Sequence, residues 1–182
     1  MILKHYKRPE VQSVLVSEAA DKEIGVRFLA GFYGKRPDTL HYPKDVLEFA
    51  MKGASSFHAS EEIWSQPLDL GPHLKPHEVT ELRKGWDLIL DIDCKELEYS
   101  RIAADLVISA LHHHDIENFG VKFSGNHGFH IGVPFSAFPA HINGQPMEEL
   151  FPEAARRIAA YLKQMIKEPL AEELRRHTLY TL

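Results

Sequence analysis

The segment Trp86-Asp87-Leu88-Ile89-Leu90-Asp91-Ile92-Asp93 is a hydrophobic run that ends in two alternate acids. Successive side chains of a β-strand point to opposite faces. A strand here therefore directs Asp91 and Asp93 to one face, roughly 7 Å apart, and Ile92 to the core. Two carboxylates on one face are costly without a cation. The pair predicts either a site for a hard divalent ion such as Mg²⁺ or a strand end whose acids meet water.

A second motif occupies residues 121–131, with the sequence Val-Lys-Phe-Ser-Gly-Asn-His-Gly-Phe-His-Ile. Alternation along a strand places Lys122 and Ser124 on one face, and the glycines that follow favour a tight turn into a neighbouring strand. If the two strands pair, His130 shares the polar face with Lys122 and Ser124. A hydroxyl, an ammonium and an imidazole suit a polyphosphate, and free backbone amides of the turn add neutral donors.

The order and spacing of the two motifs resemble those of the catalytic small subunit of archaeal and eukaryotic DNA primases, in the primase-polymerase superfamily. In that family a hydrophobic strand ends in Asp-x-Asp, and a helix leads to a strand that runs into Ser-Gly-x-x-Gly-x-His. Residues 21–28 and 55–64 resemble the earlier strands of the family. The likeness is strongest over residues 21–135.

The resemblance implies template-directed nucleotidyl transfer, which makes primers for DNA replication. It assigns Asp91 and Asp93 as the catalytic ligands of Mg²⁺ or Mn²⁺. It also predicts a set of nucleotide-phosphate ligands around the turn: Lys122, Ser124, Gly125, His127 and His130. The implied partners are nucleoside triphosphates, a DNA template and a large primase subunit.

Two features depart from the family pattern. The variable places of the turn hold Asn126 and His127, where family members often carry a basic residue. The third catalytic aspartate of the family has no counterpart, because the chain after Pro139 reads as helix and tail. The chain is therefore expected to be either a fragment or a shortened homologue with incomplete metal ligation.

Other classes of protein also use one or both features. In a haloacid-dehalogenase-like phosphohydrolase, Asp91 would be the nucleophile and Asp93 the acid or base. A metal-dependent glycosyltransferase could use the same pair of acids. Both readings leave Ser124 and His130 without a role. A catalytically inactive nucleotide- or DNA-binding module with the primase fold is the third alternative, and the missing third acid motivates it.

Composition bounds the molecule without choosing its chemistry. A length of 182 residues with 44% hydrophobic content supports one sizeable core and predicts a single domain over residues 1–182. One cysteine, Cys94, suits a reducing compartment and predicts a cytoplasmic location. No apolar run approaches the roughly 20 residues that cross a bilayer, so no membrane association is expected. A net charge of −5 argues against strong unaided binding of nucleic acid and suggests a basic partner.

Periodicity predicts an α/β order, with an α+β mixed sheet and flanking helices as the primase-polymerase catalytic core. Strands are expected over residues 24–29, 54–58, 86–93, 119–123 and 129–133. Helices are expected over residues 9–20, 43–51, 97–111 and 152–166, the last within a C-terminal helical tail, 147–182. Pro169 is expected to end or restart that last helix. Lys35 and Arg36 are interpreted as solvated surface charges.

Overall fold

The computed structural model describes residues 2–180, with side chains as far as His177. The chain divides into two compact units, Met1–Gly85 (unit 1) and Trp86–Leu182 (unit 2). Each unit has its own cluster of buried hydrophobic residues. The single domain over residues 1–182 that the sequence predicts stays a prediction.

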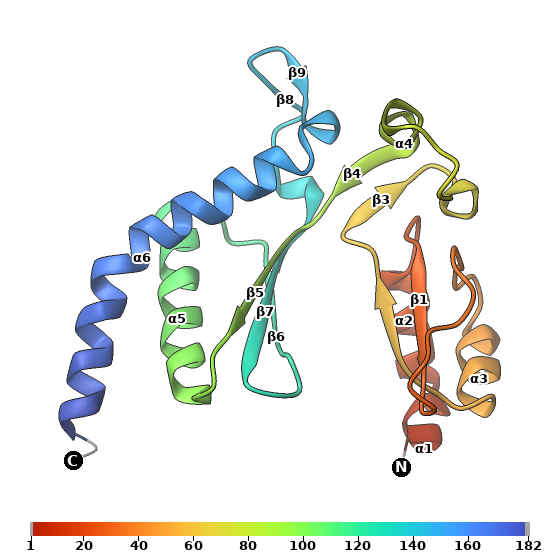
Figure 1. Ribbon diagram of the computed structural model, residues 1–182, viewed down its shortest axis with the longest axis horizontal. Coiled ribbons are helices and arrows are strands. Elements are labelled where there is room, and N and C mark those ends of the chain that lie inside the picture. Colours follow the sequence, from red (N-terminus) through yellow and green to blue (C-terminus); the bar gives the residue numbers. More distant parts are fainter. Residues whose placement is uncertain (1, 181–182) are drawn as a thin grey trace. The chain divides into compact units, whose positions relative to one another are not determined.

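Unit 1 is built from short helices around two small antiparallel sheets (Figure 1). The elements are α1 (Ile2–Tyr6), α2 (Pro9–Glu18), β1 (Ile24–Phe28), α3 (Pro43–Met51), β2 (Ala54–Ala59), β3 (Glu62–Trp64), a 3₁₀ turn η1 (Pro67–Asp69), α4 (Pro76–Leu82) and β4 (Arg83–Trp86), whose last residue is the first of unit 2. Proline opens α2, α3 and α4. Its fixed φ suits the first helical position, and an N–H at that position would have no partner within the helix. Strand β1 pairs with β2, and β3 pairs with β4.

One face of the β1-β2 pair carries the core of unit 1. Ile24 and Val26 of β1 are buried, and Val46 of α3 is fully buried in the same cluster. Phe57 of β2, opposite Val26, packs against this cluster. The alternate residues of β1 and β2 therefore point away from this cluster of buried side chains.

Unit 2 is a three-stranded antiparallel sheet with two long helices. Its elements are β5 (Leu88–Asp93), α5 (Leu97–His113), β6 (Gly120–Phe123), β7 (Gly128–Val133), the 3₁₀ turns η2 (Phe135–Ala137) and η3 (Met147–Leu150), a small β8-β9 pair (His141–Ile142, Gln145–Pro146) and α6 (Glu153–Tyr180). The strand order is β5-β7-β6, and each neighbouring pair is antiparallel. Strands β5 and β6 therefore run in the same direction, and α5 is the crossover between them.

Both long helices lie on the same side of this sheet (Figure 1). The buried cluster of unit 2 joins Leu88, Ile131 and Val133 of the sheet to Leu111 of α5 and Leu162 of α6. Burial of these side chains is the main favourable term that holds the helices on the sheet. The opposite face of the sheet carries the alternate residues of each strand.

The expected class, an α+β sheet with flanking helices, is confirmed. The predicted strands and helices lie within a few residues of the observed ones, except that the last helix, expected to end at residue 166, continues to Tyr180. Helices α1 and α4 and strands β4, β8 and β9 were not predicted. The sequence of α4 is short and lies directly after a proline- and glycine-rich loop, so its periodicity is too brief to detect. Within the described part of the chain, no helix has the length and apolar character to span a membrane.

The prediction that Pro169 ends or restarts the last helix is wrong, because α6 runs from Glu153 to Tyr180 with Pro169 inside it. The ribbon of α6 bends along its length (Figure 1), as expected for a helix interrupted by a proline that lacks an N–H. Packing holds the helix on both sides of the proline. Met165 packs against the buried cluster, and the His177 ring meets Tyr99 of α5 edge-on.

Candidate functional site

The strand register of unit 2 brings the predicted residues into rows across one face of the sheet. Asp91 lies opposite His130, and His130 lies opposite Lys122 on its other side. Residues that face each other across antiparallel strands share a face. Asp91, His130 and Lys122 thus form one row that spans the three strands β5, β7 and β6.

A second row lies one step toward the turn between β6 and β7. Asp93 is opposite Gly128, and the Ser124 N–H donates to the Gly128 carbonyl at 2.8 Å. Asp93, Gly128 and Ser124 follow the first row on the same face, since each is two residues from a member of that row, with Ser124 directly after the end of β6. The face that the sequence predicts to be polar is confirmed, with two rows that each contain one acid of the Asp-x-Asp pair.

The polar face is open to solvent. The side chain of Asp91 is 68% exposed and that of His130 is 31% exposed, and Nε2 of His130 lies 3.4 Å from Oδ1 of Asp91. Lys122 and Asp93 are exposed as well. At this distance the imidazole and the carboxylate interact directly, and both stay accessible to a ligand from solvent.

The Ser124 hydroxyl organises the turn. Its Oγ accepts hydrogen bonds from the backbone N–H of Gly128 at 3.2 Å and of Asn126 at 3.4 Å. The prediction of free turn amides is therefore wrong for these two groups, because the serine side chain takes them. A hydroxyl has two acceptor sites and one donor. With both acceptor sites engaged, the Ser124 hydroxyl keeps its O–H as a donor.

Glycine at position 128 lets the turn approach β5. A Cβ atom on Gly128 would lie 2.1 Å from the carbonyl oxygen of Ile92 and 3.0 Å from Oδ1 of Asp93. Every residue except glycine would collide with the backbone of β5 there. The close approach keeps Asp93 and Ser124 in one row. Gly125 has φ of +94°, a conformation that L side chains rarely adopt, and it begins the reversal of the chain.

Two residues near these rows lie outside them. His127 is exposed within the turn, next to the glycine that touches β5. Asp87, the first acid of the stretch, accepts a hydrogen bond from the Phe135 N–H at 2.9 Å. Asp87 therefore fixes the loop after β7 and is not part of the rows that Asp91 and Asp93 begin.

The protein offers two acids to a metal ion. Asp91 and Asp93 supply carboxylate oxygens, which are the ligands that Mg²⁺ and Mn²⁺ prefer. In the described part of the chain, three or more His, Cys, Asp or Glu side chains do not gather in a way that could hold a metal ion. Mg²⁺ commonly binds through one or two carboxylates and takes its other ligands from phosphate and water. The pair fits a metal that arrives with a phosphate ligand.

Unit 1 contains ion pairs that linear spacing did not reveal. Arg36 donates two hydrogen bonds to the Glu23 carboxylate, at 2.8 and 2.5 Å, and Glu23 is buried. This carboxylate raises the pKa of the Arg36 guanidinium above its ordinary value. Arg36 is a surface charge as interpreted, since its side chain is 62% exposed, but it is also paired with a buried carboxylate 13 residues away. Only the pairing of distant segments brings the two together.

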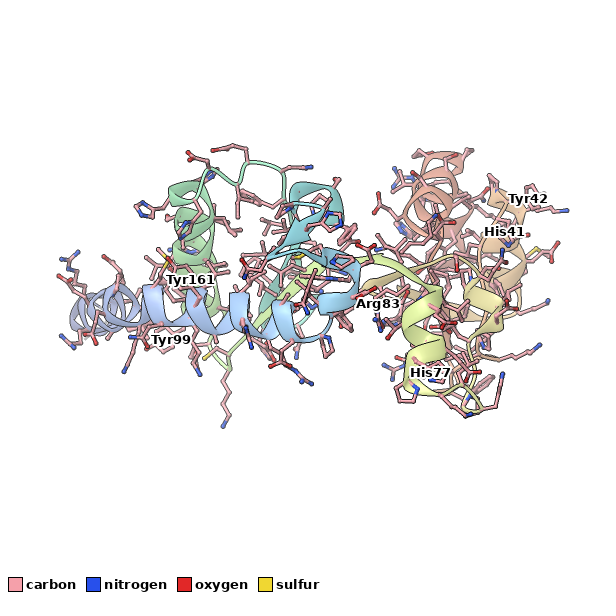
Figure 2. All side chains as sticks on the ribbon, turned by 90° about the horizontal axis from the view of Figure 1, so that it is seen from above. His41, Tyr42, His77, Arg83, Tyr99 and Tyr161 are labelled. Atoms are coloured by element: carbon pink, nitrogen blue, oxygen red, sulfur yellow. The ribbon has the colours of Figure 1, made fainter. Side chains whose placement is uncertain are left out.

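A cavity of about 510 Å³ lies beside this ion pair in unit 1, lined by Glu23, Arg36, Trp64 and neighbouring residues of the η1 loop. Trp64 is buried, and the Arg83 guanidinium lies over its ring at 5.6 Å (Arg83 is labelled in Figure 2). Both acids of the lining are ion-paired, Glu23 with Arg36 of the lining and Glu62 with Arg83 beside it. The cavity is separate from the two rows of unit 2 and was not predicted.

The chain was compared with known proteins. No protein-family model matches it, and the curated proteins contain no sequence that matches it. The residues and their geometry therefore carry the functional argument.

Proposed function

We propose that the chain binds a nucleoside triphosphate with Mg²⁺ or Mn²⁺ on the open face of the β5-β7-β6 sheet, and that it serves DNA primer synthesis as a primase-type nucleotidyltransferase. The observation that carries the proposal is the pair of rows Asp91–His130–Lys122 and Asp93–Gly128–Ser124. Acids stand on one edge strand of this face, and cationic and hydroxyl groups stand on the other strands.

This order of charges matches a metal-bound polyphosphate. The outer strands β5 and β6 are separated by two strand spacings, about 10 Å, which leaves room for a metal ion and a phosphate chain between them. Lys122 supplies positive charge to the phosphates, and Ser124 donates its free O–H proton to a phosphate oxygen. His130 lies between the acids and Lys122 and can bind a phosphate oxygen through a ring N–H.

Asp91 and Asp93 would hold the ion. When bound, a divalent ion lowers the pKa of an attacking 3′-hydroxyl and neutralises the departing pyrophosphate. The residues of this chain position the triphosphate so that the α-phosphorus faces that hydroxyl, and they supply fixed donors where charge accumulates. A DNA template, a large primase subunit and a cytoplasmic location belong to the same proposal.

A nucleotide-binding module without turnover is the second candidate. The observation that favours it is the pair of acids, which falls one short of the three carboxylates of the primase family. A haloacid-dehalogenase-like phosphohydrolase has no such support, since it leaves Ser124 and His130 without a role. Both remaining candidates need the same nucleotide site, and they differ only in product.

The first test is calorimetric binding of a nonhydrolysable nucleoside triphosphate, with and without Mn²⁺. Wild-type protein should bind more tightly with Mn²⁺. The Asp91→Ala and Asp93→Ala variants should lose this enhancement, with affinity lower by about 10-fold or more, equivalent to at least about 1.4 kcal/mol. His130→Ala should weaken binding with and without the metal, because it removes a contact to phosphate.

Asp69→Ala is the matched control, since Asp69 is an exposed acid of unit 1 outside the site. It should bind as wild type does. Folded wild-type protein that binds no nucleotide, or Asp91→Ala protein that keeps the Mn²⁺ effect, would refute the proposed site. Primer synthesis on a template with labelled triphosphates then separates the enzyme from the module.

A further inference from the structure

The outward face of the β1-β2 pair in unit 1 carries an aromatic and cationic surface that the nucleotide site does not use. Gly25 lies opposite His58, and Arg27 lies opposite Ser56. Tyr33 extends this arrangement, because it forms an isolated β-bridge with Arg27. These residues alternate with Val26 and Phe57, which face the core. We name the set Arg27, Tyr33, Ser56 and His58 the β1-β2 face.

The Tyr33 ring is placed by its surroundings and is still accessible. It lies over Gly25, where a Cβ would be 3.7 Å from Cδ1 of the ring. Its edge meets the His58 ring at a centroid distance of 5.7 Å. Half of the Tyr33 residue surface is nevertheless exposed. A ring that packs on one side and is open on the other provides a surface on which a flat base can stack.

Cationic groups flank this ring. Arg27 is exposed, and its guanidinium forms no ion pair with any described residue. Lys35 is exposed two residues after Tyr33. Glu23, the residue that precedes β1, is buried and paired with Arg36. The β1-β2 face therefore presents uncompensated positive charge beside an exposed aromatic ring.

The distribution of charge between the two units indicates which kind of ligand suits the β1-β2 face. Lys and Arg together equal Asp and Glu in number in unit 1, so the net charge of −5 belongs entirely to unit 2. A polyanion is repelled by unit 2 except where a metal ion intervenes, and it meets local positive charge on the β1-β2 face. A single strand of nucleic acid alternates phosphates with flat bases. These groups suit the cationic side chains and the aromatic ring of the β1-β2 face.

We propose that the β1-β2 face binds single-stranded nucleic acid, with one base stacked on Tyr33 and a phosphate held by Arg27. This proposal rests on the proposed function, since template-directed transfer needs a single strand as template. It assigns the template strand to residues of unit 1, separate from the triphosphate ligands of unit 2.

The test is fluorescence anisotropy of a labelled oligodeoxythymidine of about 16 nucleotides at several salt concentrations. Tyr33→Ala should weaken binding by about 5- to 100-fold, the loss expected for one stacked base, and Tyr33→Phe should retain most of the affinity. Arg27→Gln should weaken binding and reduce the slope of log K against log salt by about 0.7, since one phosphate contact is lost. A merely structural role for Arg27 would not change that slope.

Matched controls lie on α6. Tyr161 is 52% exposed and Arg157 is exposed, so Tyr161→Ala (Figure 2) and Arg157→Gln remove similar groups elsewhere. Both should bind the oligonucleotide as wild type does. Unchanged affinity in Tyr33→Ala, equal losses in the controls, or no binding by wild-type protein at low salt would each overturn the proposal.

Nucleotide binding separates this proposal from the function on which it rests. Tyr33→Ala should keep the Mn²⁺-dependent binding of triphosphate, and Asp91→Ala should keep the affinity for the oligonucleotide. Protein that binds the oligonucleotide through Tyr33 but binds no triphosphate would refute the nucleotide site and support the β1-β2 face. Protein that binds triphosphate while Tyr33→Ala leaves oligonucleotide affinity unchanged would do the reverse.

Discussion

Single residues of the candidate site have clearly separable tasks. Asp91 and Asp93 present carboxylates to solvent, whereas Asp87 in the same stretch holds the loop after β7 through the Phe135 N–H. Ser124 closes its own turn and still retains a proton to donate. Gly128 contributes by the absence of a side chain. The chemistry of the site thus depends as much on these supporting residues as on the acids.

Gly128→Ala should destabilise unit 2 by about 1–3 kcal/mol, because the added methyl group meets the Ile92 carbonyl and forces β5 and β7 apart. Urea denaturation followed by circular dichroism gives the change in free energy of unfolding. Gly120→Ala is the control, since a Cβ at Gly120 meets no heavy atom within 4 Å. Equal stability of the two variants would contradict the close approach seen at Gly128.

At the scale of elements, short helices are tied to the sheet by specific side chains. Tyr6 at the end of α1 is buried, and its hydroxyl donates to the Ser55 carbonyl of β2 at 3.1 Å. Its ring meets Phe57 edge-on at 5.1 Å. Burial raises the pKa of the Tyr6 phenol. A helix of five residues has little stability of its own, so this contact anchors it.

Tyr6→Phe should lower the free energy of unfolding by about 1 kcal/mol near neutral pH, because the Ser55 carbonyl loses its donor. The raised pKa means that the neutral phenol stabilises the fold below about pH 10, the ordinary tyrosine pKa, and that this contribution is lost as pH rises through the raised value. The difference between wild type and variant should therefore shrink in alkali. Urea denaturation at neutral and alkaline pH measures it.

Tyr42→Phe is the control for this prediction, since Tyr42 is 61% exposed at the start of α3. It should change stability little at neutral pH, as surface substitutions do. A Tyr6→Phe variant whose deficit stays constant through the alkaline range would show that ionisation of Tyr6 is not linked to unfolding.

At the scale of the whole molecule, the two units differ in charge and have separate hydrophobic clusters. All of the net negative charge belongs to unit 2, which also carries the acids of the candidate site. The buried cluster of unit 1 includes Val46, and that of unit 2 includes Leu111 and Ile131. Proposed template binding by unit 1 and proposed triphosphate binding by unit 2 follow this division.

Leu111→Ala should remove about 2–5 kcal/mol from unit 2, since Leu111 is 1% exposed, and should leave unit 1 largely unchanged. Hydrogen exchange by mass spectrometry at increasing urea reports both units at once. Peptides from β5 and β7 should lose protection, and those from β1 should keep it. Val46→Ala, in the core of unit 1, should give the converse. Equal loss in both units by both variants would instead confirm the single domain that the sequence predicts.

Local sequence patterns predicted much of the fold and of the candidate site. Alternation in the stretch before Asp93 identified a strand with two acids on one face. The same rule placed Lys122 of β6 and Ser124, the residue after β6, on one face. Proline marked the start of α2 and α3. These signals are reliable because they depend on short-range sterics, which neighbouring residues alone determine.

Contacts between distant segments were decided only by the tertiary structure. Local spacing in the sequence does not predict three features: the pairing of Arg36 with Glu23, the position of Tyr33 over Gly25, and the continuation of α6 through Pro169. By itself, the sequence determined which side chains share a face of each strand. The tertiary structure decided which strands pair and in which register, because those choices depend on the summed burial of side chains far apart in the chain.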